Sequence, residues 1–123
     1  MHNEVPIIAV VDDDEAVRAA VRLLLISYGW QVQVFASAGE FLDASTRHPP
    51  DCLVLDLNMP GMSGAELLEA LSARGTELPS VVISGESEST LAIRARASGA
   101  KAILAKPFRD EDFHSSVTRA LAA

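Results

Sequence analysis

Short apolar segments recur along the chain and alternate with amphipathic ones. The apolar segments cover residues 7–11, 31–35, 52–55, 81–84 and 102–105. Most of them show no alternation of polar and apolar positions, which is typical of parallel strands that are buried on both faces. The pattern therefore predicts a parallel sheet of short strands.

The segments between these strands show helical periodicity. A first helix carries one apolar stripe, formed by Val17, Val21, Leu24 and Tyr28. The sequences SAGE (37–40) and SGAE (63–66) match the capping box and predict the starts of a second and a third helix. A fourth helix is expected at about 87–98 and a fifth from about 110 to the end of the sequence. The fourth has only Leu91 and Ile93 as large apolar residues, so it is expected to pack lightly.

Strands that alternate with helices predict an α/β fold, a doubly wound (βα)5 parallel sheet with helices on both faces. The 123 residues fit a single domain, 1–123, with no effector domain in this chain. Acidic residues outnumber basic ones, 17 to 10, and the net charge of −7 argues against nucleic-acid binding. No apolar run approaches the ~18 residues of a membrane span and the start lacks a basic signal region, so we expect a cytoplasmic protein. Cys52, the single cysteine, is expected to be a buried structural thiol.

Polar side chains follow several of the predicted strands. In an open parallel sheet, ligands bind outside the carboxyl ends of the strands. The residues at these ends are Asp12, Asp13, Asp14, Asp56, Ser84, Gly85, Lys106 and Pro107. Carboxylates, a hydroxyl and an ammonium group are therefore expected to converge on one edge of the sheet.

Crowded carboxylates repel one another unless a cation joins them. Such oxygens suit a hard divalent cation, Mg²⁺ first and Mn²⁺ as a substitute. With a cation and a lysine beside it, one carboxylate becomes a competent nucleophile toward phosphorus, because both positive charges stabilise the transferring oxygens. A hydroxyl on the neighbouring strand end is then able to donate to the phosphoryl group and act as a switch.

Each of these residues also has a purely structural interpretation. Asp14 is well placed to cap the first helix, Asp56 to form a turn, and Lys106 to lie in solvent. Trp30 is expected to pack, and His2, His48 and His114 have no metal-ligand spacing and are assigned to the surface. The basic residues Arg94, Arg96 and Lys101 form either a solvated face or a partner surface.

The chain resembles the receiver domains of two-component response regulators. The segments VVDDDEAVR, LVLDLNMPGMSG, VVISGE and GAKAILAKPF carry the resemblance over essentially the whole length. VFASAGEFL (34–42) further resembles regulators of the nitrogen-fixation and nitrate-response type. The resemblance implies a flavodoxin-like fold with strand order 2-1-3-4-5, as in chemotaxis regulators.

The resemblance also implies roles for individual residues. Asp56 is the implied phosphoacceptor. The phosphoryl group comes from a histidine kinase or a histidine phosphotransfer protein. Asp12, Asp13, Asp56 and the backbone carbonyl of Asn58 are the implied Mg²⁺ ligands. Lys106 pairs with the phosphoryl oxygens, Ser84 is the switch hydroxyl, and Pro107 follows a cis peptide bond. Asn58 and Glu86 occupy positions that influence the lifetime of the acyl phosphate.

The implied output surface comprises the fourth helix, the fifth strand and the fifth helix. Receiver domains usually have an aromatic residue or histidine three positions before the lysine, whereas this chain has Ile103. Since that ring takes no part in the chemistry, the departure affects how the signal is transmitted. Dimerisation on phosphorylation and the downstream target, a protein or an effector domain, stay open.

The leading hypothesis is a phosphorylation-controlled switch that acts only on itself and is not an enzyme toward other substrates. The alternative is an interaction module that keeps the fold but signals without phosphate, which Ile103 favours and the complete polar set disfavours. A phosphatase of the haloacid dehalogenase type fits poorly, because DDDEA lacks that class's motif. A flavin-binding protein fits poorly too, because the loop after the first strand is acidic.

Overall fold

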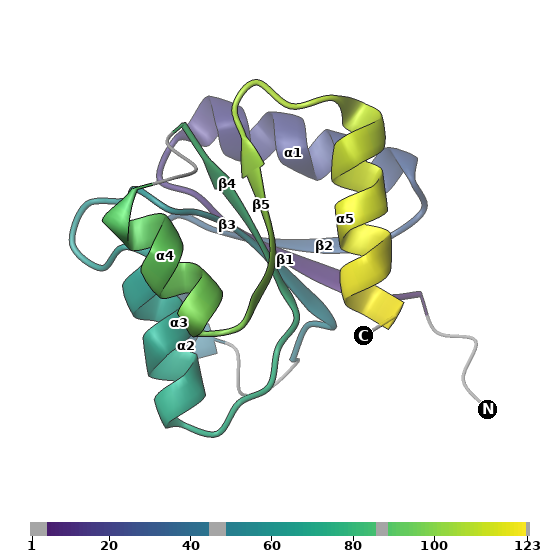
Figure 1. Cartoon of the computed structure of the whole chain (residues 1–123). Coiled ribbons are helices and arrows are strands. Elements are labelled where there is room, and N and C mark those ends of the chain that lie inside the picture. The colour runs from purple at the N-terminus through teal and green to yellow at the C-terminus, as the bar shows by residue number, and fades with distance from the viewer. Residues whose placement is uncertain (1–4, 45–48, 86–88, 123) are drawn as a thin grey trace.

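The computed structural model describes residues 5–44, 49–85 and 89–122, which form a sheet covered by helices on both faces (Figure 1). The elements in chain order are β1 (Ile7–Val11), α1 (Glu15–Ser27), β2 (Gln31–Phe35), α2 (Ala38–Ala44), β3 (Cys52–Asp56), α3 (Gly64–Ala73), β4 (Ser80–Ser84), α4 (Thr90–Ala97), β5 (Ala100–Ala105) and α5 (Asp110–Ala122). All strand pairs are parallel and the order is β2-β1-β3-β4-β5. The predicted fold class and strand order are confirmed.

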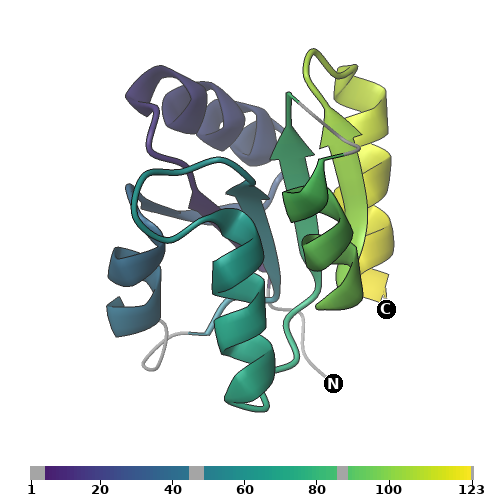
Figure 2. The same ribbon diagram turned by 60° about the vertical axis from the view of Figure 1, so that its left-hand side comes forward.

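The sheet separates two apolar cores, and the turned view shows the helices as layers on either side of it (Figure 2). One core joins the sheet to α2, α3 and α4 and is centred on Phe41, Leu67 and Leu71. The other joins it to α1 and α5 and includes Leu25 and Phe113. Because β1, β3 and β4 are covered on both faces, almost every residue in them is buried, as the unbroken apolar runs predict.

Strand register aligns the carboxyl ends of the central strands. Val11 lies opposite Leu55, Asp56 opposite Ile83, and Ser84 opposite Ala105. The residues that follow these positions therefore emerge at one edge of the sheet. This edge is where the sequence predicted the functional side chains to meet.

Several element boundaries differ from the sequence predictions. β5 begins at Ala100 rather than 102, because exposed Lys101 on this edge strand interrupts the apolar run. β4 begins at Ser80, where its pairing with β5 shifts register. The fourth helix is shorter than 87–98, because Ser89 caps it by accepting from the backbone N–H of Ala92.

The two predicted capping boxes have different outcomes. At α3, the N–H of Glu66 donates to the Ser63 hydroxyl at 3.1 Å, and the N–H of Ser63 donates to the Glu66 carboxylate at 2.9 Å. This capping box is confirmed. At α2, Ser37 accepts from the N–H of Glu40 at 3.1 Å, but the Glu40 carboxylate accepts from Ala36. The prediction of a complete box there is wrong. β2 ends at Phe35, so the N–H of Ala36 has no strand partner, and it is this N–H that donates to the Glu40 carboxylate.

Candidate functional site

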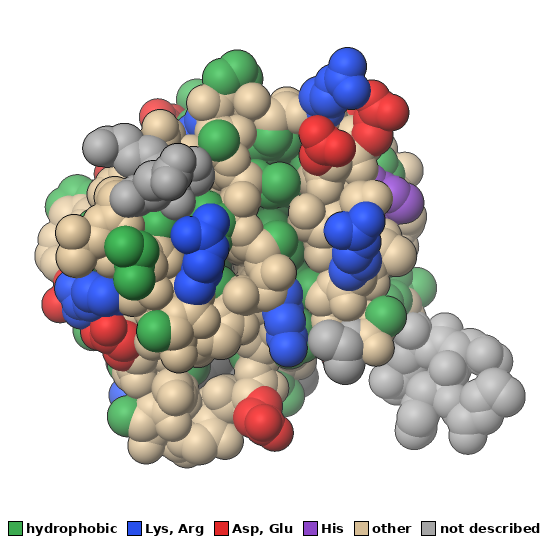
Figure 3. All heavy atoms as spheres, viewed as in Figure 1, with side chains coloured by type: hydrophobic (Ala, Val, Ile, Leu, Met, Phe, Trp, Pro, Cys, Tyr) green, Lys and Arg blue, Asp and Glu red, His purple; other side chains and the backbone are tan. Residues whose placement is uncertain are grey.

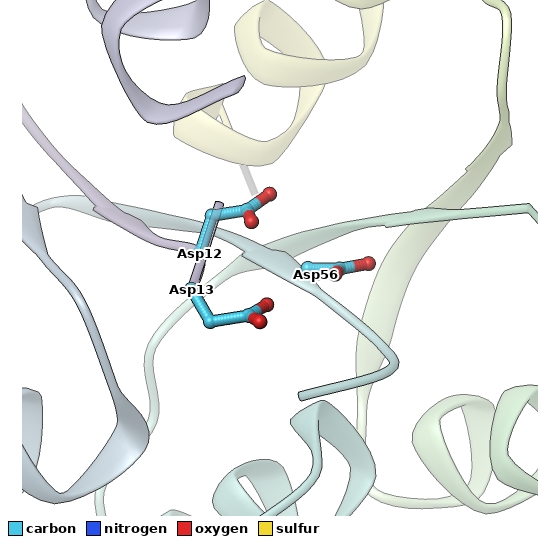
Figure 4. Close-up of side chains that lie close together, drawn as sticks. All are labelled: Asp12, Asp13 and Asp56. Atoms are coloured by element: carbon cyan, nitrogen blue, oxygen red, sulfur yellow. The ribbon is translucent and has the colours of Figure 1, made fainter. Parts of the chain in front are cut away.

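Three carboxylates meet at the carboxyl edge of the sheet. Asp12 and Asp13 follow β1 and Asp56 ends β3, and one oxygen from each lies within 4.8 Å of the others. The close-up shows the three carboxylates pointing the same way (Figure 4). The expectation that these side chains converge is confirmed.

The backbone around Asp12 is fixed by several hydrogen bonds. Its N–H donates to the carbonyl of Phe35 at 3.1 Å, and its carboxylate accepts from the N–H of Asp14 at 2.9 Å. The Arg18 guanidinium donates to the Asp12 carbonyl at 2.8 Å. Asp12 is only 3% exposed, and burial raises the pKa of its carboxyl, with the nearby charge of Asp56 adding to the rise. The site thus holds a buried carboxylate in a set orientation.

Asp14 is separate from this cluster. Its side chain accepts from the N–H groups of Ala16 and Val17 at 2.9 and 3.2 Å and caps α1. The structural interpretation of the third aspartate is therefore confirmed. The run of three aspartates divides into two members of an acidic site and one helix cap.

Lys106 faces Asp56 across the site. Its Nζ lies 3.7 Å from Oδ1 of Asp56, whose side chain is 10% exposed while that of Lys106 is 35% exposed. Burial raises the pKa of Asp56, and the charge of Lys106 and the backbone hydrogen bond from Asn58 oppose that rise. A single lysine leaves the acidic cluster short of positive charge.

Ser84 and the Lys106–Pro107 segment lie on adjacent strand ends. Ser84 is fully buried, and its carbonyl accepts from the N–H of Lys106 at 2.9 Å. The Lys106–Pro107 peptide bond is cis, as the resemblance implies.

The remaining predicted positions surround this edge. Asn58 is exposed in the loop after β3, and Glu86 lies outside the described residues. Ile103 is half-buried and packs against the core under α2, α3 and α4. Cys52 is buried as expected, and burial raises the pKa of its thiol to about 12.

Sequence reasoning missed two supporting residues, Arg18 and Gly64. A Cβ on Gly64 would lie 2.4 Å from the Asp56 carbonyl oxygen and 2.9 Å from Cα of Leu57. The N–H of Gly64 also donates to the Leu57 carbonyl at 2.9 Å. The start of α3 therefore approaches the backbone of Asp56 as closely as only glycine allows. Gly64, the second glycine of GMSG (61–64), was the available signal, but its position in the sequence does not reveal this contact.

The donor set fits a divalent cation with oxygen ligands. Three carboxylates lie close together, two of them buried with raised pKa values, which is the situation that a bound cation relieves. The oxygens come from residues at the carboxyl ends of two adjacent strands, β1 and β3. On this ground the residues present are suited to Mg²⁺.

We expect Asp56→Asn to stabilise the protein by about 1 kcal/mol at neutral pH without divalent cations, since it removes a buried charge. A folded-state pKa above the ordinary 3.8 means that ionisation opposes folding, so the gain is present at neutral pH. It is lost as the pH falls through the raised pKa and is gone below 3.8, where wild-type Asp56 is protonated in both the folded and the unfolded state. Urea unfolding at several pH values measures this, with Asp43→Asn, at an exposed position of α2, as control. An equal gain in both variants would contradict the expectation.

Comparisons with known proteins agree with this fold. The family model described as the response regulator receiver domain matches residues 8–118. The chain belongs to the receiver-domain family of two-component response regulators. This is the family that the sequence motifs indicate, rather than the phosphatase or flavin-binding classes.

Individual relatives are regulators longer than this chain. It is 42% identical over 112 residues to the transcriptional regulatory protein FixJ of Azorhizobium caulinodans, covering 91% of the chain and 53% of FixJ. It is 37% identical over 121 residues to the response regulator protein TmoT of Ectopseudomonas mendocina, covering 98% and 55%. The chain spans about half the length of these curated relatives.

Solved structures show the same fold. The crystal structure of FixJ-N superposes with a TM-score of 0.90 at 34% identity, covering 97% of this chain and 95% of that one. The response regulator StyR superposes with a TM-score of 0.86 at 39% identity, covering 97% and 60%. No helix in the described part of the chain is long and apolar enough to cross a membrane.

Proposed function

We propose that this chain is a phosphorylation-controlled switch that accepts a phosphoryl group on Asp56 in a Mg²⁺-dependent reaction. The observation that carries the proposal is the cluster of Asp12, Asp13 and Asp56 with Lys106 Nζ 3.7 Å from Asp56. A structural adaptor has no need of buried carboxylates beside a lysine, since burying them costs stability.

The residues divide the chemistry between them. Asp12, Asp13, Asp56 and the backbone carbonyl of Asn58 would hold the cation, which when bound supplies charge that neutralises the carboxylates and the phosphoryl oxygens. An Oδ of Asp56 attacks phosphorus as the P–N bond of a donor phosphohistidine breaks, and the bonding electron pair stays with the leaving imidazole. Lys106 pairs with the equatorial oxygens.

The remaining residues serve the response. The Ser84 hydroxyl donates to the new phosphoryl group, and Asn58 and Glu86 influence access of water to the acyl phosphate. The protein modifies only itself and is not an enzyme toward another substrate. The chain acts in the cytoplasm. Its partners are a sensor histidine kinase or histidine phosphotransfer protein and a downstream protein or effector domain, and nucleic acid and membranes are not partners of this chain.

The output surface is proposed to be the face formed by α4, β5 and α5, which Figure 3 shows with Lys and Arg side chains on it. Arg96 and Lys101 are exposed there, as is Ile93, which is 61% exposed. An exposed aliphatic side chain among cations suits contact with another protein better than full solvation. Phosphorylation-dependent pairing of two copies through this face is one form of that contact, which sizing in both states tests.

Intact-mass spectrometry after incubation with a small phosphodonor tests the proposal. We expect one Mg²⁺-dependent phosphoryl addition in the wild type and none in Asp56→Asn, which keeps the shape of the side chain but is not a nucleophile. Absence of addition under all conditions would favour the phosphate-independent interaction module instead.

A further inference from the structure

Helix α4 is held by little apolar packing. Its buried residues are Ala92 and Ala95, whose side chains are single methyl groups, Leu91 packs against the core but is only partly buried, and Ile93 points outward with 61% exposure. By contrast, α3 buries Leu67, Leu68 and Leu71. Since apolar burial stabilises in proportion to area, α4 has the weaker attachment.

An open hollow next to α4 further reduces its support. The hollow has a volume of about 780 Å³ and lies between the C-terminal half of α3, the connection from α3 to β4, and the turn that follows α4. Leu68 and Leu71 line it from α3, and Ser98 and Gly99 line it from the end of α4. The C-terminal end of α4 therefore has room to move relative to α3.

One polar contact spans these two helices. Arg94 of α4 donates from Nε to Oε2 of Glu69 at 2.9 Å and from its terminal nitrogen to Oε1 at 2.6 Å. Such a bidentate pair fixes both distance and orientation. The side chains are 42% and 40% exposed, so the pair is accessible and able to break without burying a charge.

Both side chains of this pair are charged at neutral pH. The hydrogen bonds from Arg94 hold the pKa of the Glu69 carboxyl below its ordinary 4.5. Arg94 also lies in the last turn of α4, where a positive charge is favourable to the helix dipole. The contact is therefore an ion pair throughout the physiological range.

We propose that the Glu69–Arg94 pair is a latch that sets the position of α4 and so regulates the switch, which deepens and rests on the proposed function. β4 ends at Ser84, and α4 is the next helix along the chain, so only a few residues separate the proposed switch hydroxyl from the start of α4. Ile103, in place of an aromatic residue, packs against the same core as Ala92 and Ala95. The latch opposes displacement of α4, and breaking it shifts the unphosphorylated chain toward the phosphorylated arrangement.

Hydrogen exchange of the α4 amides measures the latch in the unphosphorylated protein. Glu69→Gln and Arg94→Gln are each expected to speed exchange in α4 about two- to five-fold, as for an exposed ion pair, and to leave α1 unchanged. The exchanged pair, Glu69→Arg with Arg94→Glu, is expected to restore protection above either single charge reversal. Arg96→Gln is the matched control, because it removes the same charge from an exposed position of the same helix.

Affinity for fluoroberyllate, a phosphoryl analogue, in the presence of Mg²⁺ measures the coupling. It is expected to rise in Glu69→Gln, because a ligand that binds the displaced arrangement of α4 binds more tightly when that arrangement is more populated. Unchanged exchange in Glu69→Gln, an equal effect of Arg96→Gln, or unchanged affinity would overturn the latch. If exchange rises but no variant or wild type binds fluoroberyllate, the proposed function fails and the latch stands only as a constraint on α4.

Discussion

Asp13→Asn is expected to weaken Mg²⁺ binding by on the order of ten- to a hundred-fold, because it removes one of three clustered negative charges. Asp13 is exposed, so its replacement leaves the core and the strand ends in place. The loss should therefore appear in metal affinity rather than in folding. Titration calorimetry with Mg²⁺ measures it directly.

Asp14→Asn provides a matched control one residue away. Asparagine caps a helix as well as aspartate does, so the hydrogen bonds to Ala16 and Val17 are preserved. Because the Asp14 carboxylate lies outside the cluster, its loss should change Mg²⁺ affinity by less than about two-fold, through screened long-range charge alone. Equal losses in the two variants would mean that the acidic run acts by general charge and not as a site.

Gly64→Ala is expected to destabilise the protein by about 1–3 kcal/mol and to slow phosphorylation of Asp56 at the same time. The new Cβ would overlap the Asp56 carbonyl oxygen and crowd Cα of Leu57. Both are backbone atoms, so relief requires α3 or the end of β3 to shift. A shift of Asp56 disturbs its alignment with Lys106, which lowers the rate.

Gly39→Ala separates this effect from the general preference of helices for alanine. At Gly39 an added Cβ meets only the Ser37 hydroxyl at 3.8 Å, an ordinary contact. This variant should be neutral or more stable, because alanine has the higher helix propensity and a less flexible unfolded state. Urea unfolding and initial phosphorylation rates of both variants test the expectation. A Gly64→Ala protein with normal stability and rate would show that the close approach is not needed.

The sequence predicted the fold well where burial dictates the pattern. β1, β3 and β4 are covered on both faces, and their unbroken apolar runs reveal them. At the edge strand β5, an unbroken apolar run does not mark the whole strand, because Lys101 faces solvent within it. The start of the fourth helix was placed too early for a related reason. With so little apolar periodicity in α4, the apolar pattern does not mark where the helix begins.

The convergence of the acidic site was predictable because chain order and strand ends alone bring Asp12, Asp13 and Asp56 together. The contacts that support the acidic site were not predictable from the sequence. The hydrogen bond from Arg18 to the Asp12 carbonyl and the close approach of Gly64 depend on helix placement to within an ångström or so. The Glu69–Arg94 pair joins two helices whose relative rotation no local pattern specifies.

The identity of the phosphoacceptor is the central claim, and locating the modified residue tests it most directly. Borohydride reduction of the phosphorylated protein converts an acyl phosphate to an alcohol, and tandem mass spectrometry of the peptides then identifies the residue that carried it. We expect the reduced residue at Asp56 alone, and only in samples that contained Mg²⁺. Reduction at Asp12 or Asp13, or at Asp56 without a divalent cation, would contradict the proposed division of roles at this site.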